Sequence, residues 1–355
     1  MAASLAAATF AFGEGTQIWR QTKFEDFEKG TAKGVAIRSD GALELAPAFR
    51  SLYTTPSAYL WDIASDASGN AYAAAGSPAR VYRITPDGKS SVIFEPQELQ
   101  VQALIADGKD GLFAATSPDG KVYRIVPKES TTGAKKDQKK AVARAAEPAK
   151  SDADATAVEG NYTSSVYFDP KTKYIWDLAL GKDGTLYIAT GDHGEIYKVD
   201  RDGKGSLFFK SDEAHIRALQ IDAKGNVIAG SDGSGLIYRI SPAGEAFVLY
   251  STPKKEITAL ALDEKGNIYA AGGGEKQHSP NPSATTLNLG PAAAAPAISL
   301  SPGTSLASSS APASPAGGSE IYMISPDGAP RRLWSSATDL VYALGFDGHG
   351  RLLAG

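Results

Sequence analysis

A short apolar block recurs along the chain, and this repeat constrains the fold more than any other feature. The block has four residues, and its six copies begin at Ala71, Leu112, Leu186, Val227, Ile268 and Leu352. Three of the intervals between successive starts are 41 residues. The other two, 74 and 84 residues, are one such period plus an insertion of 33 or 43. A period of about 40 residues is typical of the blades of a β-propeller.

The stretch Tyr174–Lys210 shows what each repeat contains. Short runs rich in β-branched and aromatic residues alternate with Gly and Asp-Gly turns, which predicts strands joined by tight hairpins. The expected strands are Trp176–Leu180, Thr185–Thr190, Glu195–Val199 and Ser206–Phe209. The third of these recurs along the chain in the form Val-Tyr-Arg-Ile, and a Pro-Asp-Gly or Pro-Ala-Gly turn follows three of its copies.

We therefore expect an all-β chain that forms a β-propeller of four-stranded blades. A lone blade cannot bury both faces of its sheet, whereas blades stacked in a ring cover one another and leave only short edges. Five repeats are complete. Residues 34–45 match the third and fourth strands of another repeat, and residues 340–355 match the first and second. Either these halves close the ring as one composite blade, or the chain is a fragment with a truncated last blade, so about six blades are expected.

Composition excludes several classes of function. The net charge of −4, with no Lys/Arg cluster inside the repeats, argues against a nucleic-acid-binding surface. No apolar run is long enough to span a bilayer. The absence of cysteine excludes disulfides, thiolate catalysis and cysteine-ligated metal sites. We expect a monomer whose partner is a protein or a small molecule.

Three segments depart from the repeat, and the propeller is expected over residues 16–355. Residues 1–15 are Ala-rich and weakly apolar, as at the end of a secretory signal peptide or in a disordered N-terminus, which points to a secreted or periplasmic protein. Residues 127–162 form a Lys/Ala-rich insertion in the hairpin between a third and a fourth strand. Residues 275–319 form a Pro/Ser/Ala-rich insertion, expected to be disordered. Both insertions are interpreted as tolerated surface loops rather than recognition elements.

One position of the first strand changes chemistry from repeat to repeat, which a core position would not do. Its residues are Trp61, Gln102, Trp176, Arg217, Thr258 and Tyr342. The next position is Ala in four repeats and a carboxylate, Asp62 or Asp177, in the other two. We interpret these residues as the mouth of the central channel, where aromatic and a few convergent polar groups would meet a ligand. The alternative is that they plug the channel and join blades.

The turns on the same face of the ring add two candidates. His193 beside Asp192 is a possible base or metal ligand, although a histidine in such a turn is more often solvated. The chain has no GxSxG, P-loop or dinucleotide motif. We therefore assign no catalytic residue, metal ligand or cofactor. On the opposite face, the recurrent Asp-x-x-Gly-Asn element is predicted to be a hairpin turn whose Asp caps its own backbone.

That element also carries a resemblance. Residues 263–271, Asp-Glu-Lys-Gly-Asn-Ile-Tyr-Ala-Ala, resemble the second-strand block of NHL-type, gluconolactonase-like and bacterial sensor propellers. From Trp19 onward the chain resembles uncharacterised exported bacterial propeller proteins that are often labelled WD-repeat-like. That family runs past the equivalent of Gly355, which implies a fragment. Gluconolactonase-like enzymes hold a divalent metal in the channel with Glu, Asn and Asp, and of such a set only Asp62 and Asp177 stand at channel positions here.

These observations favour a non-enzymatic propeller that binds a ligand or a protein at one face of the ring. Two other functions stay open. One is an enzyme, a metal-dependent lactonase or a lyase that uses the channel carboxylates. The other is the extracytoplasmic sensor propeller of a larger signalling protein.

Overall fold

The computed structural model describes residues 33–37, 42–46, 51–108, 111–128, 161–276 and 317–355. The predictions for residues 1–15, and for most of 127–162 and 275–319, lie outside these ranges. The described chain is all β, as predicted, and contains no helix. It follows that no described helix could cross a membrane.

The chain divides into two units, Met1–Leu52 and Tyr53–Gly355. Within the first, β1 (Val35–Ile37) and β2 (Leu43–Leu45) form an antiparallel pair. The second unit holds all the other strands.

Five successive groups of four antiparallel strands make up most of the second unit, and we call them blades 1 to 5. Blade 1 comprises β3 (Tyr59–Ser65), β4 (Ala71–Gly76), β5 (Arg80–Ile84) and β6 (Ser90–Phe94). Blade 2 comprises β7 (Gln100–Ala106), β8 (Leu112–Ser117), β9 (Gly120–Pro127) and β10 (Tyr162–Thr172). Blade 3 comprises β11 (Ile175–Leu180), β12 (Leu186–Thr190), β13 (Glu195–Val199) and β14 (Gly205–Lys210). Blade 4 comprises β15 (His215–Ile221), β16 (Val227–Asp232), β17 (Leu236–Ile240) and β18 (Ala246–Ser251). Blade 5 comprises β19 (Lys254–Leu262), β20 (Ile268–Glu275), β21 (Ser319–Ile324) and β22 (Pro330–Ser335).

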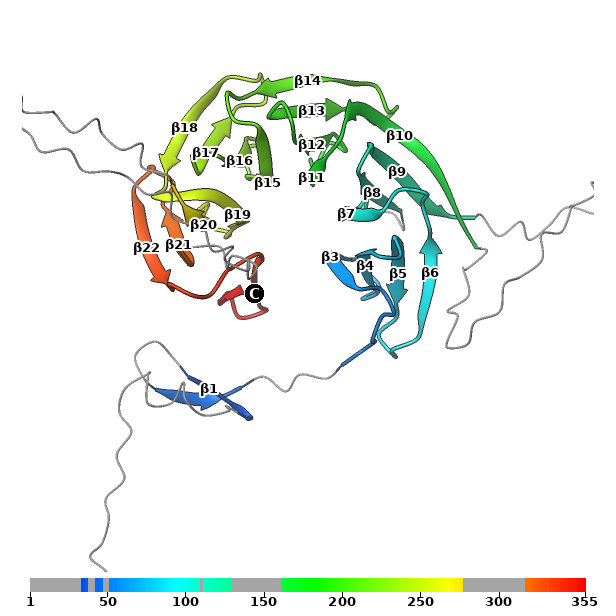
Figure 1. Ribbon diagram of the computed structural model, residues 1–355, viewed down its shortest axis with the longest axis horizontal. Helices are drawn as coiled ribbons and strands as arrows, with labels where there is room; N and C mark the ends of the chain where they lie inside the picture. The colour runs from blue at the N-terminus through cyan, green and yellow to red at the C-terminus, as the bar shows by residue number, and fades with distance from the viewer. Residues whose placement is uncertain (1–32, 38–41, 47–50, 109–110, 129–160, 277–316) are drawn as a thin grey trace, which may run out of the picture. The chain divides into compact units, whose positions relative to one another are not determined.

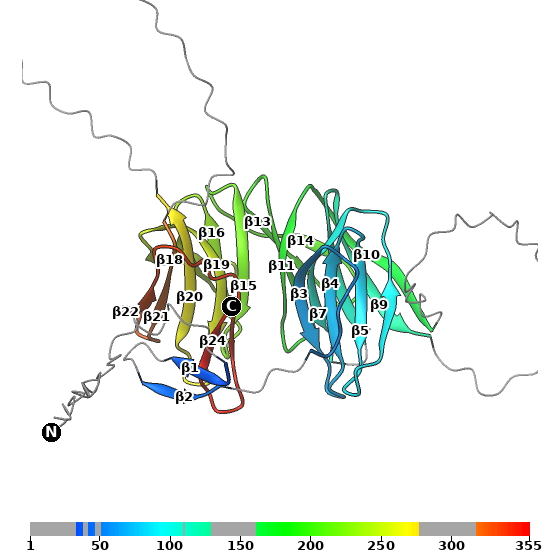
Figure 2. The same cartoon turned by 60° about the horizontal axis from the view of Figure 1, so that its bottom comes forward.

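Each blade places its first strand innermost and its fourth strand outermost, as Figures 1 and 2 show. The predicted four-stranded propeller blade is therefore confirmed. After blade 5 comes one further pair, β23 (Leu344–Phe346) and β24 (Leu352–Ala354). The total number of blades in the ring stays a prediction.

Apolar packing between consecutive blades holds the second unit together. The second strands β8 and β12 are buried along their whole length, because neighbouring blades cover both faces of the sheet. Each of the larger clusters of buried residues joins two neighbouring blades. Ile196 of blade 3 and Ile216 of blade 4, for example, are both fully buried in one such cluster. Burial of an isoleucine of this kind contributes roughly 1.5–3 kcal/mol.

A β-bulge recurs in the first strand of every complete blade. The pairing with the second strand skips one residue, between Leu60 and Asp62 in blade 1 and at the matching place in the others. The skipped residues are Trp61, Gln102, Trp176, Arg217 and Thr258. These are the positions that vary from repeat to repeat. A bulge leaves one residue out of the ladder and re-aims its side chain, which frees that position from the demands of the core.

Blade 1 differs from the others on one face of its first strand. Leu60 and Ile63 of β3 are 50% and 66% exposed. The residues at the position of Leu60 in the next four blades, Val101, Ile175, Ile216 and Ile257, are each 0% exposed. The preceding blade covers them in each case, and no described strand of the second unit covers β3 in this way.

Candidate active site

A stack of side chains centred on Trp176 lies where the first strands of blades 3 and 4 meet. Tyr174 lies parallel to the indole, with 5.2 Å between the ring centroids and 13° between the planes. The guanidinium carbon of Arg217, on the neighbouring first strand, lies 3.9 Å from the centroid of the Trp176 ring. The bulges in β11 and β15 allow this contact, because they release both side chains from the ladder. A guanidinium this close to an indole face makes a favourable cation–π contact.

Glu256 of blade 5 extends the stack across a second boundary between blades. Its Oε1 accepts a hydrogen bond from Nε of Arg217 at 2.6 Å, and both side chains are about one-quarter exposed. A partly buried ion pair of this geometry orients the guanidinium plane. One continuous set of contacts therefore joins three blades.

His215 lies against the edge of the same stack and receives two N–H groups. The indole N–H of Trp176 donates to its Nδ1 at 3.3 Å, and the backbone N–H of Asp192 donates to the same atom at 3.4 Å. Because Nδ1 accepts both bonds, the neutral imidazole carries its hydrogen on Nε2. The fold thus selects one tautomer, in which Nε2–H is a hydrogen-bond donor.

Gly191 is what lets these groups approach one another. A Cβ added there would lie 2.6 Å from both Nδ1 of His215 and Nε1 of Trp176. Thr172 holds the turn in place, since its hydroxyl donates to the carbonyl oxygen of Gly191 at 2.9 Å. Asp192, next in the turn, has a positive φ of 71°, a conformation that Asp tolerates better than most residues.

A charged groove adjoins the stack, and the adjacent residues Asp192 and His193, both candidates from the sequence, line it. It encloses about 730 Å³ between the β8–β9 turn, the end of β10 with the following Lys173, and the β12–β13 turn. Its lining residues are Asp119, Lys121, Asp169, Lys171, Thr172, Lys173, Asp192 and His193. Lys121 pairs with Glu98, and Lys171 pairs with Asp169. Among the described residues, no acid lies within ion-pair distance of Lys173.

Asp62 and Asp177 occupy equivalent positions, directly after the bulge in the first strands β3 and β11. Each carboxylate accepts a hydrogen bond from the backbone of the next blade. Asp177 accepts the backbone N–H of Leu178 and, across the blade boundary, that of Leu219, each at 2.7 Å. Asp62 accepts the N–H of Ile63 and of Leu104 in the same way. Burial, opposed by the hydrogen bond from Leu219 and aided by the nearby Asp62 charge, raises the pKa of Asp177 to about 7. Burial also raises the pKa of Asp62.

The remaining candidates from the sequence are dispersed. Trp61 stacks on Tyr59, with 5.6 Å between the ring centroids. Gln102 accepts a hydrogen bond from Gln100 within its own strand. The hydroxyl of Thr258 bonds to main-chain carbonyls, and Tyr342 is 62% exposed.

Sequence reasoning missed Tyr174, His215 and Glu256 as site residues. All three stand two residues before the variable position of their repeats, and therefore on the same side of the first strand. The equivalent residues in blades 1 and 2 are Tyr59 and Gln100. An internal alignment of this second position, which also changes chemistry between repeats, could have revealed them.

No group of three or more His, Asp or Glu that could hold a metal ion exists among the described residues. We derive no step through a metal.

Comparisons with known proteins bear on the fold. No family model matches the sequence, and no curated protein matches it. The structure is similar to virginiamycin B lyase from Staphylococcus aureus, with a TM-score of 0.54 and 12% identity over 88% of this chain and 81% of that one. It is also similar to PQQ-bound aldose sugar dehydrogenase from Streptomyces coelicolor, with a TM-score of 0.51 and 13% identity over 84% of this chain and 87% of that one.

A third solved structure comes from a larger protein. It is the extracellular domain of a protein described as a one-component system from B. thetaiotaomicron, with a TM-score of 0.51 and 11% identity. The match covers 86% of this chain but only 33% of that one. All three are bacterial proteins that support the propeller fold.

These findings correct one prediction. The sequence favoured a non-enzymatic binding scaffold, but the similar propellers include a lyase and a dehydrogenase. The comparisons therefore favour the enzyme alternative. Repeat motifs misled the sequence argument because they encode blade structure and are shared by enzymes and scaffolds alike.

Proposed function

We propose that this chain is a lyase-type propeller enzyme whose active site lies at His215 and the adjoining groove. The observation that carries the proposal is the pair of N–H groups donated to Nδ1 of His215. They hold the neutral ring in one orientation with its hydrogen on Nε2. Such a ring is a preorganised hydrogen-bond donor, of the kind that stabilises negative charge developing in a transition state.

The reaction that fits this arrangement is elimination next to a carbonyl or carboxylate. A base removes the proton from the carbon beside the carbonyl, and the electron pair forms a carbon–carbon double bond to the next carbon. The bond from that carbon to the leaving oxygen breaks, and the oxygen takes up a proton from the protonated base or from solvent. Charge develops on the carbonyl oxygen, where Nε2–H of His215 would donate. The carboxylate of Asp192 is the candidate base, because it lines the groove and its own backbone N–H bonds to His215.

The groove supports a polar substrate. Lys173 has no acid partner among the described residues and can pair with a substrate carboxylate. The fold similarity to virginiamycin B lyase agrees with an elimination, and a catalytically inactive variant of that lyase carries alanine in place of a histidine. Export to the periplasm or beyond, and a monomeric state, remain part of the proposal.

The test is turnover of two substrates. In each of them a carbonyl or carboxylate acidifies a C–H bond, and the neighbouring carbon bears the oxygen that leaves. Purified protein is mixed with a uronic-acid oligosaccharide or with quinupristin, and the conjugated product is followed by ultraviolet absorbance. We expect one of them to be consumed, and His215→Ala to lower kcat/KM by about 100-fold or more, as for other transition-state donors.

His349→Ala serves as the matched control, because His349 is an exposed histidine in the β23–β24 turn. It should keep full activity. Undiminished turnover by folded His215→Ala protein would place the chemistry elsewhere, and inertness toward both substrates would remove the support for a lyase.

A further inference from the structure

A second polar cavity lies at the boundary of blades 2 and 3, at the other end of the strands from the charged groove. It encloses about 240 Å³ and adjoins the β7–β8, β11–β12 and β13–β14 turns. The groove adjoins the β8–β9 and β12–β13 turns instead, and successive hairpin turns of an antiparallel blade lie at alternate ends of its strands. The residues that line the second cavity are Asp107, Phe113, Arg124, Tyr167, Leu180, Gly181, Lys182, Gly184 and Arg201.

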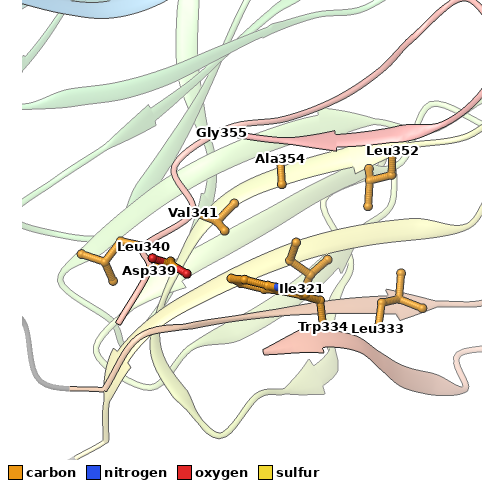
Figure 3. Close-up of a pocket in the computed structure, with 9 residues that line it drawn as sticks. All are labelled: Ile321, Leu333, Trp334, Asp339, Leu340, Val341, Leu352, Ala354 and Gly355. Carbon is orange, nitrogen blue, oxygen red and sulfur yellow. The ribbon is translucent and has the colours of Figure 1, made fainter. Parts of the chain in front are cut away.

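An excess of positive charge distinguishes this cavity from two others. Its charged lining residues are three cations and one acid. The groove balances three lysines against three aspartates. The cavity of about 490 Å³ beside Trp334, shown in Figure 3, is mainly apolar, and Asp339 is the one charged side chain in its lining. Of these three cavities, only the one at the blade 2–3 boundary presents a surplus of cations to a ligand.

The acid of this cavity neutralises one of its three cations. A carboxylate oxygen of Asp107 lies 2.9 Å from Nη2 of Arg124. Within the parts of the chain that the structure describes, no acid lies within ion-pair distance of Lys182 or Arg201. Two cations on blade 3 are therefore available to an anion that enters the cavity.

Contacts within blade 3 hold Arg201 across the β11–β12 turn. Its Nε donates to the carbonyl oxygen of Asp183 at 2.6 Å. Gly184 makes room for the side chain, since a Cβ there would lie 2.5 Å from the same Nε. The carboxylate of Asp183 accepts the N–H and the hydroxyl of Thr185 and so stays within its own turn. A guanidinium anchored through Nε keeps its two terminal nitrogens for a forked contact with a carboxylate or a phosphate.

Blade 3 departs from the repeat at two positions that line this cavity. Every other complete blade has aspartate at the position of Gly181 and proline at the position of Arg201. One change removes a carboxylate and the other adds a guanidinium, so both make the boundary more positive. Proline would preset the backbone of the turn, and blade 3 gives up that support where it gains the cation. The equivalent residues are Asp66, Asp107, Asp222 and Asp263, and Pro86, Pro127, Pro242 and Pro326.

We propose that this cavity is a binding site for a small molecule that carries a phosphate or a carboxylate group. Lys182 and Arg201 of blade 3 bind the oxyanion, and Arg124 of blade 2 contributes the third cation from across the boundary. At about 240 Å³ the cavity lies below the range typical of drug-sized ligands, which limits the occupant to a small molecule. The proposal does not depend on the lyase function, because none of these residues lines the groove.

Titration calorimetry of the full chain with inorganic phosphate and with glucuronate tests the proposal, in a buffer that contains neither group. We expect saturable binding of at least one of them, and the two titrations distinguish a phosphate ligand from a carboxylate ligand. Arg201→Ala should weaken binding by about tenfold or more, because it removes a charge-assisted hydrogen bond. Gly181→Asp, which restores the residue of the other blades, should also weaken it, because the new carboxylate repels the anion.

Two further variants assign the binding to this cavity. Lys204→Ala is the matched control and should bind normally, because Lys204 is exposed in the same β13–β14 turn but does not line the cavity. Lys173→Ala separates the cavity from the groove, and binding that depends on Arg201 should survive in it.

Three results would overturn the proposal. The first is the absence of saturable binding of either anion. The second is equal affinity of the wild-type protein and folded Arg201→Ala protein, or an equal loss in Lys204→Ala. The third is complete loss of binding in Lys173→Ala, which would place the anion in the groove and leave the lyase proposal untouched.

Discussion

At the scale of single residues, the proposed site depends on a position that has no side chain. Gly191 permits Trp176 and the backbone of Asp192 to reach the same nitrogen of His215. The Asp-Gly and Gly-Asp turns of the repeats were correctly predicted as turns. What the repeat could not reveal is that one of these glycines is also required by a contact across a blade boundary.

Gly191→Ala should therefore destabilise the protein and displace His215. The new methyl group would overlap Nδ1 of His215 and Nε1 of Trp176, and overpacking of this kind costs about 1–3 kcal/mol. Urea denaturation followed by circular dichroism measures the change. Gly345→Ala is the control, since a Cβ there meets nothing within 4 Å. Equal midpoints for the two variants would contradict this account of the turn.

Asp177 predicts an unusual dependence of stability on pH. Its folded pKa of about 7 lies above the ordinary 3.8, so the folded state binds the proton more tightly than the unfolded state. Protonation of Asp177 therefore adds to the free energy of unfolding below about pH 4. This contribution, up to about 4 kcal/mol, is lost as the pH rises to about 7. Asp177→Asn should flatten this part of the profile, measured as the urea midpoint at each pH.

The exposed Asp202 supplies the comparison for that experiment, and Asp202→Asn should leave the slope unchanged. A wild-type protein that gains stability between pH 4 and pH 7 would show that Asp177 does not dominate this range.

At the scale of strands, the first strand of a blade contributes both apolar residues to the core and, at its bulge, a residue such as Trp176 or Arg217 to the proposed site. The variable position could be read from the sequence by comparing repeats, and the structure explains it as the residue of a bulge. The bulge itself was not predictable, because every complete repeat contains it and no insertion marks it. The contacts of Trp176 with His215 and of Arg217 with Glu256 were also hidden, because each joins residues 39 apart on different blades.

The first strands should differ in how much their apolar residues stabilise the fold. Ile216→Ala removes a fully buried side chain and should cost about 2–5 kcal/mol. Leu60→Ala at the equivalent position of β3 should cost less than about 1 kcal/mol, because Leu60 is half exposed. Denaturation midpoints of the two variants give the comparison. Similar losses would mean that another part of the protein covers β3 in solution.

At the scale of the whole molecule, sequence periodicity predicted the architecture well. The period of 41 residues and the turn residues were sufficient for the four-stranded blade, because a local pattern specifies each strand and hairpin. The number of blades did not follow from it, and neither did the choice between an enzyme and a binding scaffold. The apolar pattern within a blade is the same whatever the number of blades in the ring. It is also the same whether or not the ring holds an active site.

The whole-molecule pH profile should have its maximum at about pH 4 to 5. Above it, the raised pKa values of Asp62 and Asp177 lower stability as described. Below it, turn carboxylates act in the opposite sense. In Asp66, hydrogen bonds from Asn70 and its neighbours outweigh partial desolvation and lower the pKa, so stability is lost as that group is protonated. Thermal midpoints across pH test this expectation, and a maximum above pH 7 would contradict it.

The stack around Trp176 has one practical consequence. An indole in contact with a phenol, a guanidinium and an imidazole has a fluorescence that depends on all three neighbours. A molecule arriving at His215 would alter that emission without any added dye. The chain has only four tryptophans. Substitution of the other three would leave Trp176 as the single source of tryptophan fluorescence, and compounds could then be screened for binding near His215 by the change in that fluorescence.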